Sequence, residues 1–243
     1  MKILALDSSG MTATVAVVED DKLLAEYTVD YKKTHSQTLL PMLQEAGNMI
    51  ELDLETVDAI AVAGGPGSFT GLRIGSATAK GLGLALNKPL VHVPTLEGMA
   101  YNLWGTDRVV CPMMDARRNQ VYTGVYEFQQ GKLKVLADQM AVPVAEVIRK
   151  LNEMERPAIL LGDGAAVYRE AICQELKIPY LFAPAHLNRQ RASSVALCAM
   201  EYVRQGKTET AAMHQPDYLR VSQAERERAK RLKQENEGCK GEK

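Results

Sequence analysis

The chain has 243 residues, of which 46% are hydrophobic, enough for one large domain or for two lobes of about a hundred residues each. Its formal net charge of −1 excludes a global basic field of the kind that drives independent binding to nucleic acid. The four cysteines are widely spaced without a C-x-x-C pair, which argues against a zinc site or a disulfide framework and fits a reducing compartment. The apolar run before Asp7 is too short for a signal peptide, and no run reaches the about 20 residues of a membrane span. We therefore expect a cytoplasmic protein that binds no membrane.

The first part of the chain shows three strand-like runs followed by alternating helical and strand-like patterns. The predicted strands lie at 2–7, 13–19, 23–29, 59–63 and 90–93, and the predicted helices at 37–50, 71–86 and 95–103. Pro41 is expected in the first turn of its helix, where a missing N–H costs little. The order of elements is βββαβαβα.

The second part of the chain repeats this order. Its predicted strands lie at 109–114, 121–128, 133–138, 158–161 and 180–182, and its predicted helices at 143–153, 165–176 and 192–205. Two consecutive βββαβαβα units are the architecture of the actin/Hsp70/sugar-kinase (ASKHA) group, so we expect an α/β fold with lobes at 1–104 and 105–221. The remaining residues, 222–243, are rich in charge and are predicted to form a solvated, poorly ordered tail.

The segment GGPGSFTGLRIG (Gly64–Gly75) lies between a predicted strand and a predicted helix, as a phosphate-binding loop would. A Walker loop needs Gly-Lys-Ser/Thr at its end, and none is present. The dinucleotide fingerprint also fails, because Thr70 stands where its third glycine belongs. The residues therefore favour a structural turn over a phosphate site.

Small residues recur every four positions along the helix that follows this turn. Gly71, Gly75, Ala79 and Gly83 form one stripe, and glycine inside a helix costs up to about 1 kcal/mol relative to alanine. Such a stripe allows another helix to approach unusually closely. The neighbour is either a helix of the same lobe or a helix of another subunit, and the pattern alone leaves both open.

Three segments together resemble the TsaB (YeaZ) family: ILALDSS near the N-terminus, GGPGSFTGLRIGSATAKGLG, and MDARRNQVY (Met114–Tyr122). The resemblance runs from Met1 to about Val221. It implies a non-catalytic subunit of the bacterial machinery that makes threonylcarbamoyladenosine beside the tRNA anticodon. The implied partners are a TsaD-like paralogue that carries the catalysis and a TsaE-like ATPase, with tRNA contacted indirectly through the complex.

The same resemblance indicates a silent copy of the TsaD metal site. TsaD carries H-x-E-G-H, whereas the matching run here is TLEGM, so Thr95 and Met99 stand where the two histidines would be. A hydroxyl and a thioether cannot replace two imidazoles as ligands. A glycoprotease-like metallopeptidase would need H-E-x-x-H, and no two histidines lie within five residues of each other. We expect no catalytic residue and no metal.

The family resemblance also favours the subunit alternative for the small-residue stripe, because TsaB and TsaD pair through the helices of their first lobes. We predict an interface on the two helices at 37–50 and 71–86, and in the isolated chain a homodimer through the same surface. The predicted interface residues are Leu39, Leu43, Ala46, Gly71, Gly75, Ala79 and Gly83.

The alternative function is an independent ATP-binding kinase or hydrolase of the same fold group. Its phosphate would lie on Asp7, Ser8 and Ser9, with help from the GDG segment at 162–164, although these three residues fit a hairpin turn equally well. We expect no intrinsic cofactor, and ATP or ADP only weakly or at the interface of the complex. The turn with Arg117 and Arg118 fits phosphate or RNA binding and plain solvation equally.

Overall fold

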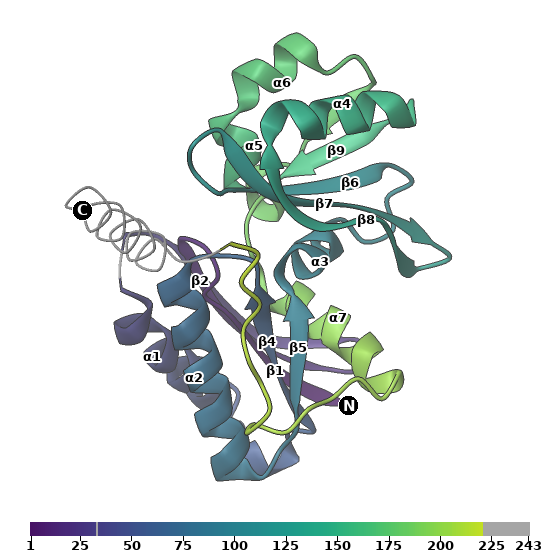
Figure 1. Ribbon diagram of the computed structural model, residues 1–243. Coiled ribbons are helices and arrows are strands. Elements are labelled where there is room, and N and C mark those ends of the chain that lie inside the picture. The colour runs from purple at the N-terminus through teal and green to yellow at the C-terminus, as the bar shows by residue number, and fades with distance from the viewer. Residues whose placement is uncertain (33, 221–243) are drawn as a thin grey trace, which may run out of the picture.

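Two lobes, each built on a five-stranded mixed sheet, make up the computed structural model, which describes residues 1–32 and 34–220 (Figure 1). The strand order is β3-β2-β1-β4-β5 in the first sheet and, read in the same direction, β8-β7-β6-β9-β10 in the second. The two sheets therefore share one topology, and the predicted two-lobed ASKHA fold with a duplicated βββαβαβα order is confirmed. The charged tail predicted at 222–243 lies outside the described residues.

The described residues of the first half form five strands, three α-helices and two 3-10 turns. They are β1 (Lys2–Asp7), β2 (Thr12–Glu19), β3 (Lys22–Asp30), α1 (His35–Met49), η1 (Leu54–Thr56), β4 (Ala59–Gly65), α2 (Phe69–Leu86), β5 (Leu90–Pro94), α3 (Thr95–Ala100) and η2 (Tyr101–Leu103). Pro41 was predicted in the first turn of its helix, which is wrong. The helix begins at His35, so Pro41 lies in the helix interior.

The second half follows the same plan, with a shorter first helix, a divided second helix and a longer last helix. Its elements are β6 (Val109–Asp115), β7 (Gln120–Gln129), β8 (Lys132–Pro143), α4 (Val144–Met154), β9 (Ala158–Leu161), α5 (Asp163–Val167), α6 (Arg169–Glu175), β10 (Tyr180–Phe182), η3 (Ala185–Leu187) and α7 (Ala192–Arg204). The single helix predicted at 165–176 is divided in two, because Tyr168 leaves the helical conformation with φ −101° and ψ 19°. Within the described part of the chain, no helix is long and apolar enough to span a membrane.

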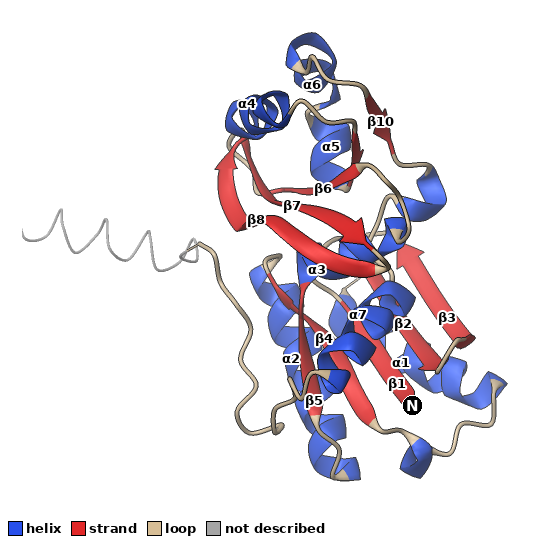
Figure 2. Ribbon diagram, turned by 90° about the vertical axis from the view of Figure 1, so that its right-hand side faces the viewer, coloured by secondary structure: helices blue, strands red, loops and turns tan. Residues whose placement is uncertain are grey.

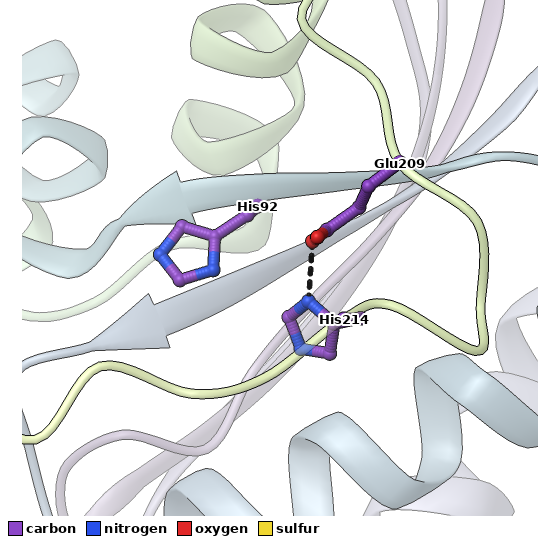
Figure 3. A group of neighbouring side chains, drawn as sticks. All are labelled: His92, Glu209 and His214. Carbon is purple, nitrogen blue, oxygen red and sulfur yellow. Dashed lines mark hydrogen bonds and ion pairs between the residues drawn. The ribbon is translucent and has the colours of Figure 1, made fainter.

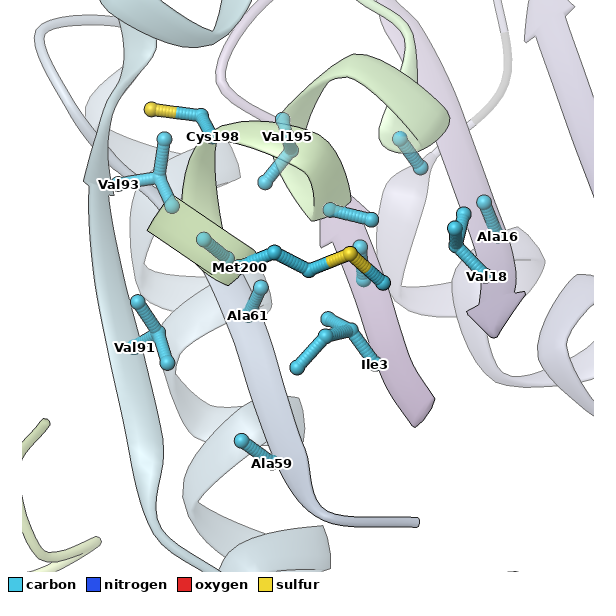
Figure 4. Packing of buried hydrophobic residues seen from close by; sticks show 14 of the residues in the cluster. Ile3, Ala16, Val18, Ala59, Ala61, Val91, Val93, Val195, Cys198 and Met200 are labelled. Carbon is cyan, nitrogen blue, oxygen red and sulfur yellow. The ribbon is translucent and has the colours of Figure 1, made fainter. Parts of the chain in front are cut away.

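The first sheet is covered by helices on both faces (Figure 2). Because side chains alternate along a strand, Leu4 and Leu6 of β1 join the core beneath α1 and α2. Ile3 and Ala5 point the other way and pack against α7, with Val195 and Met200 of that helix (Figure 4). The strands are therefore apolar on both sides, as expected for a sheet enclosed by helices.

The last helix of each half packs against the sheet of the other half. Leu96 and Met99 of α3 share a core with Val110 and Tyr126 of the second sheet. α7, although it follows the second sheet in sequence, packs against β1, β2, β4 and β5 of the first. The predicted second lobe, 105–221, therefore loses α7 to the first lobe, because the small side chains of this helix fit the open face of the first sheet.

A buried carboxylate fastens α7 to β3. Glu26 accepts hydrogen bonds from the Ser193 N–H (3.1 Å) and hydroxyl (2.6 Å), and it pairs with Arg191. Burial by itself would raise the pKa of Glu26, but the bonds from Arg191 and Ser193 outweigh it and lower that pKa. An acidic side chain at this place also supplies the N-terminus of α7 with a hydrogen-bond acceptor.

After α7 the chain returns along the edge of the first sheet, and we call residues 207–220 the C-terminal strap. Leu90 and Glu209 exchange backbone hydrogen bonds of 2.8 and 2.9 Å, so the strap begins as an addition to the edge strand β5. Further along, the Asp217 N–H donates to the Gly64 carbonyl (2.7 Å), and Arg73 of α2 donates to the Tyr218 hydroxyl (3.2 Å). The strap thus covers the β5 edge and one side of α2.

Candidate functional site

The turn after β1 lies at the end of the first sheet that faces the second lobe (Figure 1). Asp7 is buried, and its Oδ1 accepts the Ser9 N–H at 2.7 Å. Ser8 donates from its hydroxyl to the Gly71 carbonyl at 2.9 Å. Burial raises the pKa of Asp7 to about 6, against the opposing effect of its hydrogen bonds from Ser9. The three residues therefore form a hydrogen-bonded turn around a carboxylate that is costly to ionise.

The glycine loop, residues 64–71, packs directly on this turn. The Ser68 N–H donates to the Ser9 carbonyl (2.7 Å), and the Gly71 N–H donates to the Ser68 hydroxyl (3.3 Å) as an N-cap of α2. The Gly65 N–H donates to the Thr95 hydroxyl (3.1 Å). Since these amides are bonded inside the protein, the loop is a structural turn, and its geometry does not support the phosphate-loop alternative.

Close backbone approach explains why the loop is rich in glycine. A Cβ atom on Gly67 would collide with the Ser9 carbonyl oxygen, and one on Gly71 would collide with the Ser8 carbonyl oxygen. A Cβ atom on Gly64 would overlap the ring of His92. Glycine is therefore required here by packing of the loop against β1 and β5.

In the second lobe, the backbone N–H groups of Gly162 and Gly164 in the GDG segment (162–164) are also hydrogen-bonded inside the protein. The Gly162 N–H donates to Asn188 Oδ1 (2.7 Å), while Asp163 Oδ1 accepts the N–H groups of Gly164 (3.0 Å) and Asp115 (3.2 Å). Neither half of the suggested nucleotide site presents these amides to a ligand.

The residues predicted as the partner interface face the inside of the first lobe, so their assignment to an outer surface is wrong. All seven are buried: Leu39, Leu43, Ala46, Gly71, Gly75, Ala79 and Gly83. A Cβ atom on Gly75 would lie 2.7 Å from Ser8 Oγ and 3.6 Å from both Leu6 and Val62. Of the two alternatives that the sequence left open, packing within the lobe is correct. The stripe marks the face of α2 that lies on the sheet.

The opposite faces of α1 and α2 are exposed and poor in charge. Between residues 74 and 86 the only charged side chain of α2 is Lys80, whose ammonium group donates to the His214 carbonyl in the strap (3.0 Å). Leu84 is 69% exposed and Met49 of α1 is 67% exposed. We call this surface the outer helix face; its exposed residues are Leu40, Pro41, Gln44, Glu45, Asn48, Met49, Ala77, Gly81, Leu84 and Ala85.

The segment at the start of α3 is occupied by internal contacts. Thr95 is buried and uses its hydroxyl as the acceptor for Gly65, and Met99 lies in the core of the second lobe. Glu97 accepts a hydrogen bond from the Tyr202 hydroxyl at 2.7 Å, and burial raises the pKa of its carboxyl group. The two positions that would hold metal-binding histidines thus serve packing in this chain.

The hairpin turn between β6 and β7 is left-handed over three residues. Arg117, Arg118 and Asn119 have φ of 61°, 57° and 57°, and the Arg117 N–H donates to Asp115 Oδ1 at 2.8 Å. Both arginines are exposed. Exposure fits a solvated turn and a phosphate-binding turn equally, so both interpretations stand.

One cluster of potential metal ligands could not be predicted from the sequence. His92, Glu209 and His214 each place a potential ligand atom within 4.8 Å of the others. Histidine spacing gave no signal of it, because His92 belongs to β5 whereas the other two residues belong to the strap. Only the return of the chain along the β5 edge brings them together.

Comparisons with known proteins agree over nearly the whole chain. A family model described as TsaD, tRNA N6-adenosine threonylcarbamoyltransferase, matches residues 22–228. The chain is 35% identical over 227 residues to the tRNA threonylcarbamoyladenosine biosynthesis protein TsaB of Bacillus subtilis, covering 93% of this chain and 96% of that protein. It is 29% identical to the protein of the same name from Escherichia coli, with coverage of 90% and 95%. The solved structure of YeaZ from Pseudomonas aeruginosa superposes with a TM-score of 0.76 at 27% identity, covering 90% of this chain and 99% of that one.

Proposed function

Because this chain belongs to the TsaB (YeaZ) family, we propose that it is a non-catalytic subunit of the machinery that makes threonylcarbamoyladenosine in tRNA. In this proposal it acts in the cytoplasm and pairs with a TsaD-like enzyme, which carries the chemistry. A TsaE-like ATPase completes the assembly, and tRNA is contacted through the complex. Thr95 is buried and hydrogen-bonded to Gly65, and Met99 is buried in the core. The two residues support the absence of catalysis, since they offer no imidazole where TsaD-like enzymes have two.

The outer helix face is the observation that supports pairing with a TsaD-like subunit. A helix that faces water normally carries charged residues along its exposed side, whereas beyond Arg73 the exposed residues of α2 are Ala77, Gly81, Leu84 and Ala85. Small residues at Ala77 and Gly81 permit a second helix to approach closely. Two helices of this length can supply the about 800 Å² per partner of a standard interface. We assign this face to the TsaD-like subunit and, in the isolated chain, to a second copy.

Reconstitution tests the proposed function. The TsaD-like enzyme, the TsaE-like ATPase and substrate tRNA are combined with and without this chain, and modified adenosine is measured over many turnovers. We expect modification to continue only with the chain present. Full-rate turnover in its absence would refute the proposal, and ATP-dependent turnover by this chain alone would establish the kinase or hydrolase alternative.

A charge placed on the outer helix face should weaken pairing without unfolding the protein. Leu84→Glu would bury an unpaired carboxylate at the interface, and we expect the dissociation constant of the TsaD-like pair to rise tenfold or more. Light scattering of the isolated variant should show a monomer. The matched control is Val167→Glu on α5, where a 60% exposed apolar residue lies in the other lobe. Equal pairing by Leu84→Glu and the wild type would place the interface elsewhere.

A further inference from the structure

Three potential metal ligands meet where the C-terminal strap runs beside β5 (Figure 3). His214 Nδ1 lies 2.6 Å from Glu209 Oε1, and the centroids of the His92 and His214 rings are 5.6 Å apart. Figure 3 shows one ring nitrogen of His92 turned toward the carboxylate and the imidazole of the other two residues. Two imidazole nitrogens and one carboxylate oxygen therefore converge on one small volume.

The hydrogen bonding of this cluster is incomplete. The side chain of His214 is fully buried, and its Nε2 has no hydrogen-bond partner among the described residues. His92 Nε2 is also buried without a well-aligned hydrogen bond, although Asp217 Oδ2 lies 3.2 Å away. His214 Nδ1 is the ring atom that faces Glu209, so Nε2 of the same ring is the atom left without a partner.

A side chain of α2 holds the backbone at His214. Lys80 donates to the backbone carbonyl of His214 (3.0 Å), which fixes the strap at this point.

The backbone around the cluster holds all three residues in place. The ring of His92 rests on Gly64, where a side chain would overlap it. Glu209 is fixed by its paired backbone bonds to Leu90. Asp217 faces His92 Nε2, so its carboxylate favours the tautomer protonated on that atom and leaves Nδ1 free as a ligand. Such a carboxylate–histidine pair is the usual support of a metal-binding imidazole.

We propose that His92, Glu209 and His214 bind a divalent transition-metal ion, preferentially Zn²⁺, with Asp217 orienting His92. Two imidazoles and one carboxylate suit Zn²⁺, whereas Mg²⁺ and Ca²⁺ require six or more oxygen ligands. The ion replaces the proton shared by His214 and Glu209. Bonds of about 2.1 Å would place the ligand atoms about 3.4 Å from one another in a tetrahedron. Side-chain rotation therefore has to widen the 2.6 Å between His214 Nδ1 and Glu209 Oε1 and to close the longer separations, which all lie within 4.8 Å. Water supplies the fourth ligand.

The role that follows for the ion is to fasten the strap. It adds a link between β5 and a segment that hydrogen bonds, the buried Ala211 and the stacking of Tyr218 on Phe69 already hold to the first lobe. The strap in turn packs on the glycine loop through Asp217 and Gly64. Metal binding should therefore stabilise the folded chain. This inference concerns the first lobe of the isolated protein and does not depend on the proposed partner.

Metal titration of the full chain tests the proposal. The protein is stripped with a chelator, dialysed and titrated with ZnCl₂ by calorimetry, and we expect one equivalent to bind. At a hundredfold excess over the dissociation constant, the midpoint of thermal unfolding should rise by about 5–10 °C. Cobalt chloride should give the intense visible bands of a tetrahedral site, and MgCl₂ should leave both readouts unchanged.

Variants separate this site from adventitious binding. His92→Asn and Glu209→Gln replace partly exposed side chains and should each abolish the high-affinity equivalent, with unchanged circular dichroism of the metal-free protein. Asp217→Asn should weaken binding by about tenfold. The control is His186→Asn, at an exposed histidine in the second half of the chain, which should bind as the wild type does. Failure to bind zinc, or binding that His92→Asn and Glu209→Gln leave intact, would overturn the proposal.

Discussion

The variant Gly75→Leu is expected to lose its fold. A Cβ atom at this position already lies 2.7 Å from Ser8 Oγ, and the rest of a leucine side chain would have to enter the contact between α2 and β1. Overpacking typically costs about 1–3 kcal/mol and occasionally more, and a whole leucine side chain placed against β1 belongs at the upper end. That cost is a large part of the about 5–15 kcal/mol that stabilises a typical domain. Thermal unfolding followed by circular dichroism should show a midpoint lowered by 10 °C or more, or no transition at all.

Gly81→Leu is the matched control on the same helix. A Cβ atom on Gly81 meets no other atom within 4 Å, so the leucine extends into solvent. Removing a glycine from a helix interior should stabilise the fold by about 0.5–1 kcal/mol. The same leucine would obstruct the outer helix face and weaken pairing with the TsaD-like partner. Normal folding of Gly75→Leu, or unfolding of Gly81→Leu, would mean that the face of α2 has been assigned the wrong way round.

Replacing Asp7 with asparagine should stabilise the protein at neutral pH. Burial raises the pKa of Asp7 from its ordinary 3.8 to about 6, so the folded state favours the protonated carboxyl. That contribution to stability is complete below about pH 3.8 and is lost as the pH rises through about 6. With about 1.4 kcal/mol for each pKa unit, the charged form costs about 3 kcal/mol at pH 7.5. Asparagine avoids this cost and still accepts the Ser9 N–H.

The measurement is the midpoint of thermal unfolding between pH 4 and pH 7.5. We expect Asp7→Asn to exceed the wild type by about 5–10 °C at the upper end and to match it at the lower end. The control is Asp107→Asn, at an exposed residue, which should follow the wild type throughout. If Asp7→Asn is less stable than the wild type at pH 7.5, the carboxylate is stabilised by a group that these contacts omit.

The expected gain in Asp7→Asn raises the question of why a chain would retain a buried aspartate. In this fold group the first strand often ends at a nucleotide site, as the sequence suggested for Asp7, Ser8 and Ser9. Here the glycine loop lies on that turn, with the Ser68 N–H bonded to the Ser9 carbonyl. The glycine loop therefore covers the turn that the nucleotide-binding alternative would need.

Sequence patterns were sufficient for most elements because those elements depend on local rules. The runs at 2–7, 158–161 and 180–182 match the strands at both ends, since each is bounded by turn residues. The first two are also buried along almost their whole length. Repetition of the same order in the two halves then predicted the two-lobed fold. Predicted boundaries were wrong where a single residue departs from helical geometry, as Tyr168 does within the helix predicted at 165–176.

Sequence patterns could not show whether the small-residue stripe of α2 faces the sheet of its own lobe or a second subunit. Gly71, Gly75 and Ala79 are equally compatible with a neighbouring strand and with a second subunit, and only the position of α2 on the sheet decides between them. The exposed residues Ala77 and Gly81 of the same helix are also small, and their sequence pattern as an interface is no stronger than that of the buried stripe. The cluster that contains His92 and His214 was not predicted for a related reason: the two residues are close together only because of the path that the strap takes.

The reciprocal packing of α3 and α7 makes the two halves a single cooperative unit. A fragment that ends at residue 104 would expose Leu96 and Met99 and would leave the α7 face of the first sheet uncovered. A fragment that begins after residue 104 would contain α7 but not the first sheet, on which α7 packs. Opening the space between the lobes would likewise have to pull both helices from their cores, so the packing itself opposes large hinge movements between the lobes. The chain is thereby suited to serve as a rigid surface.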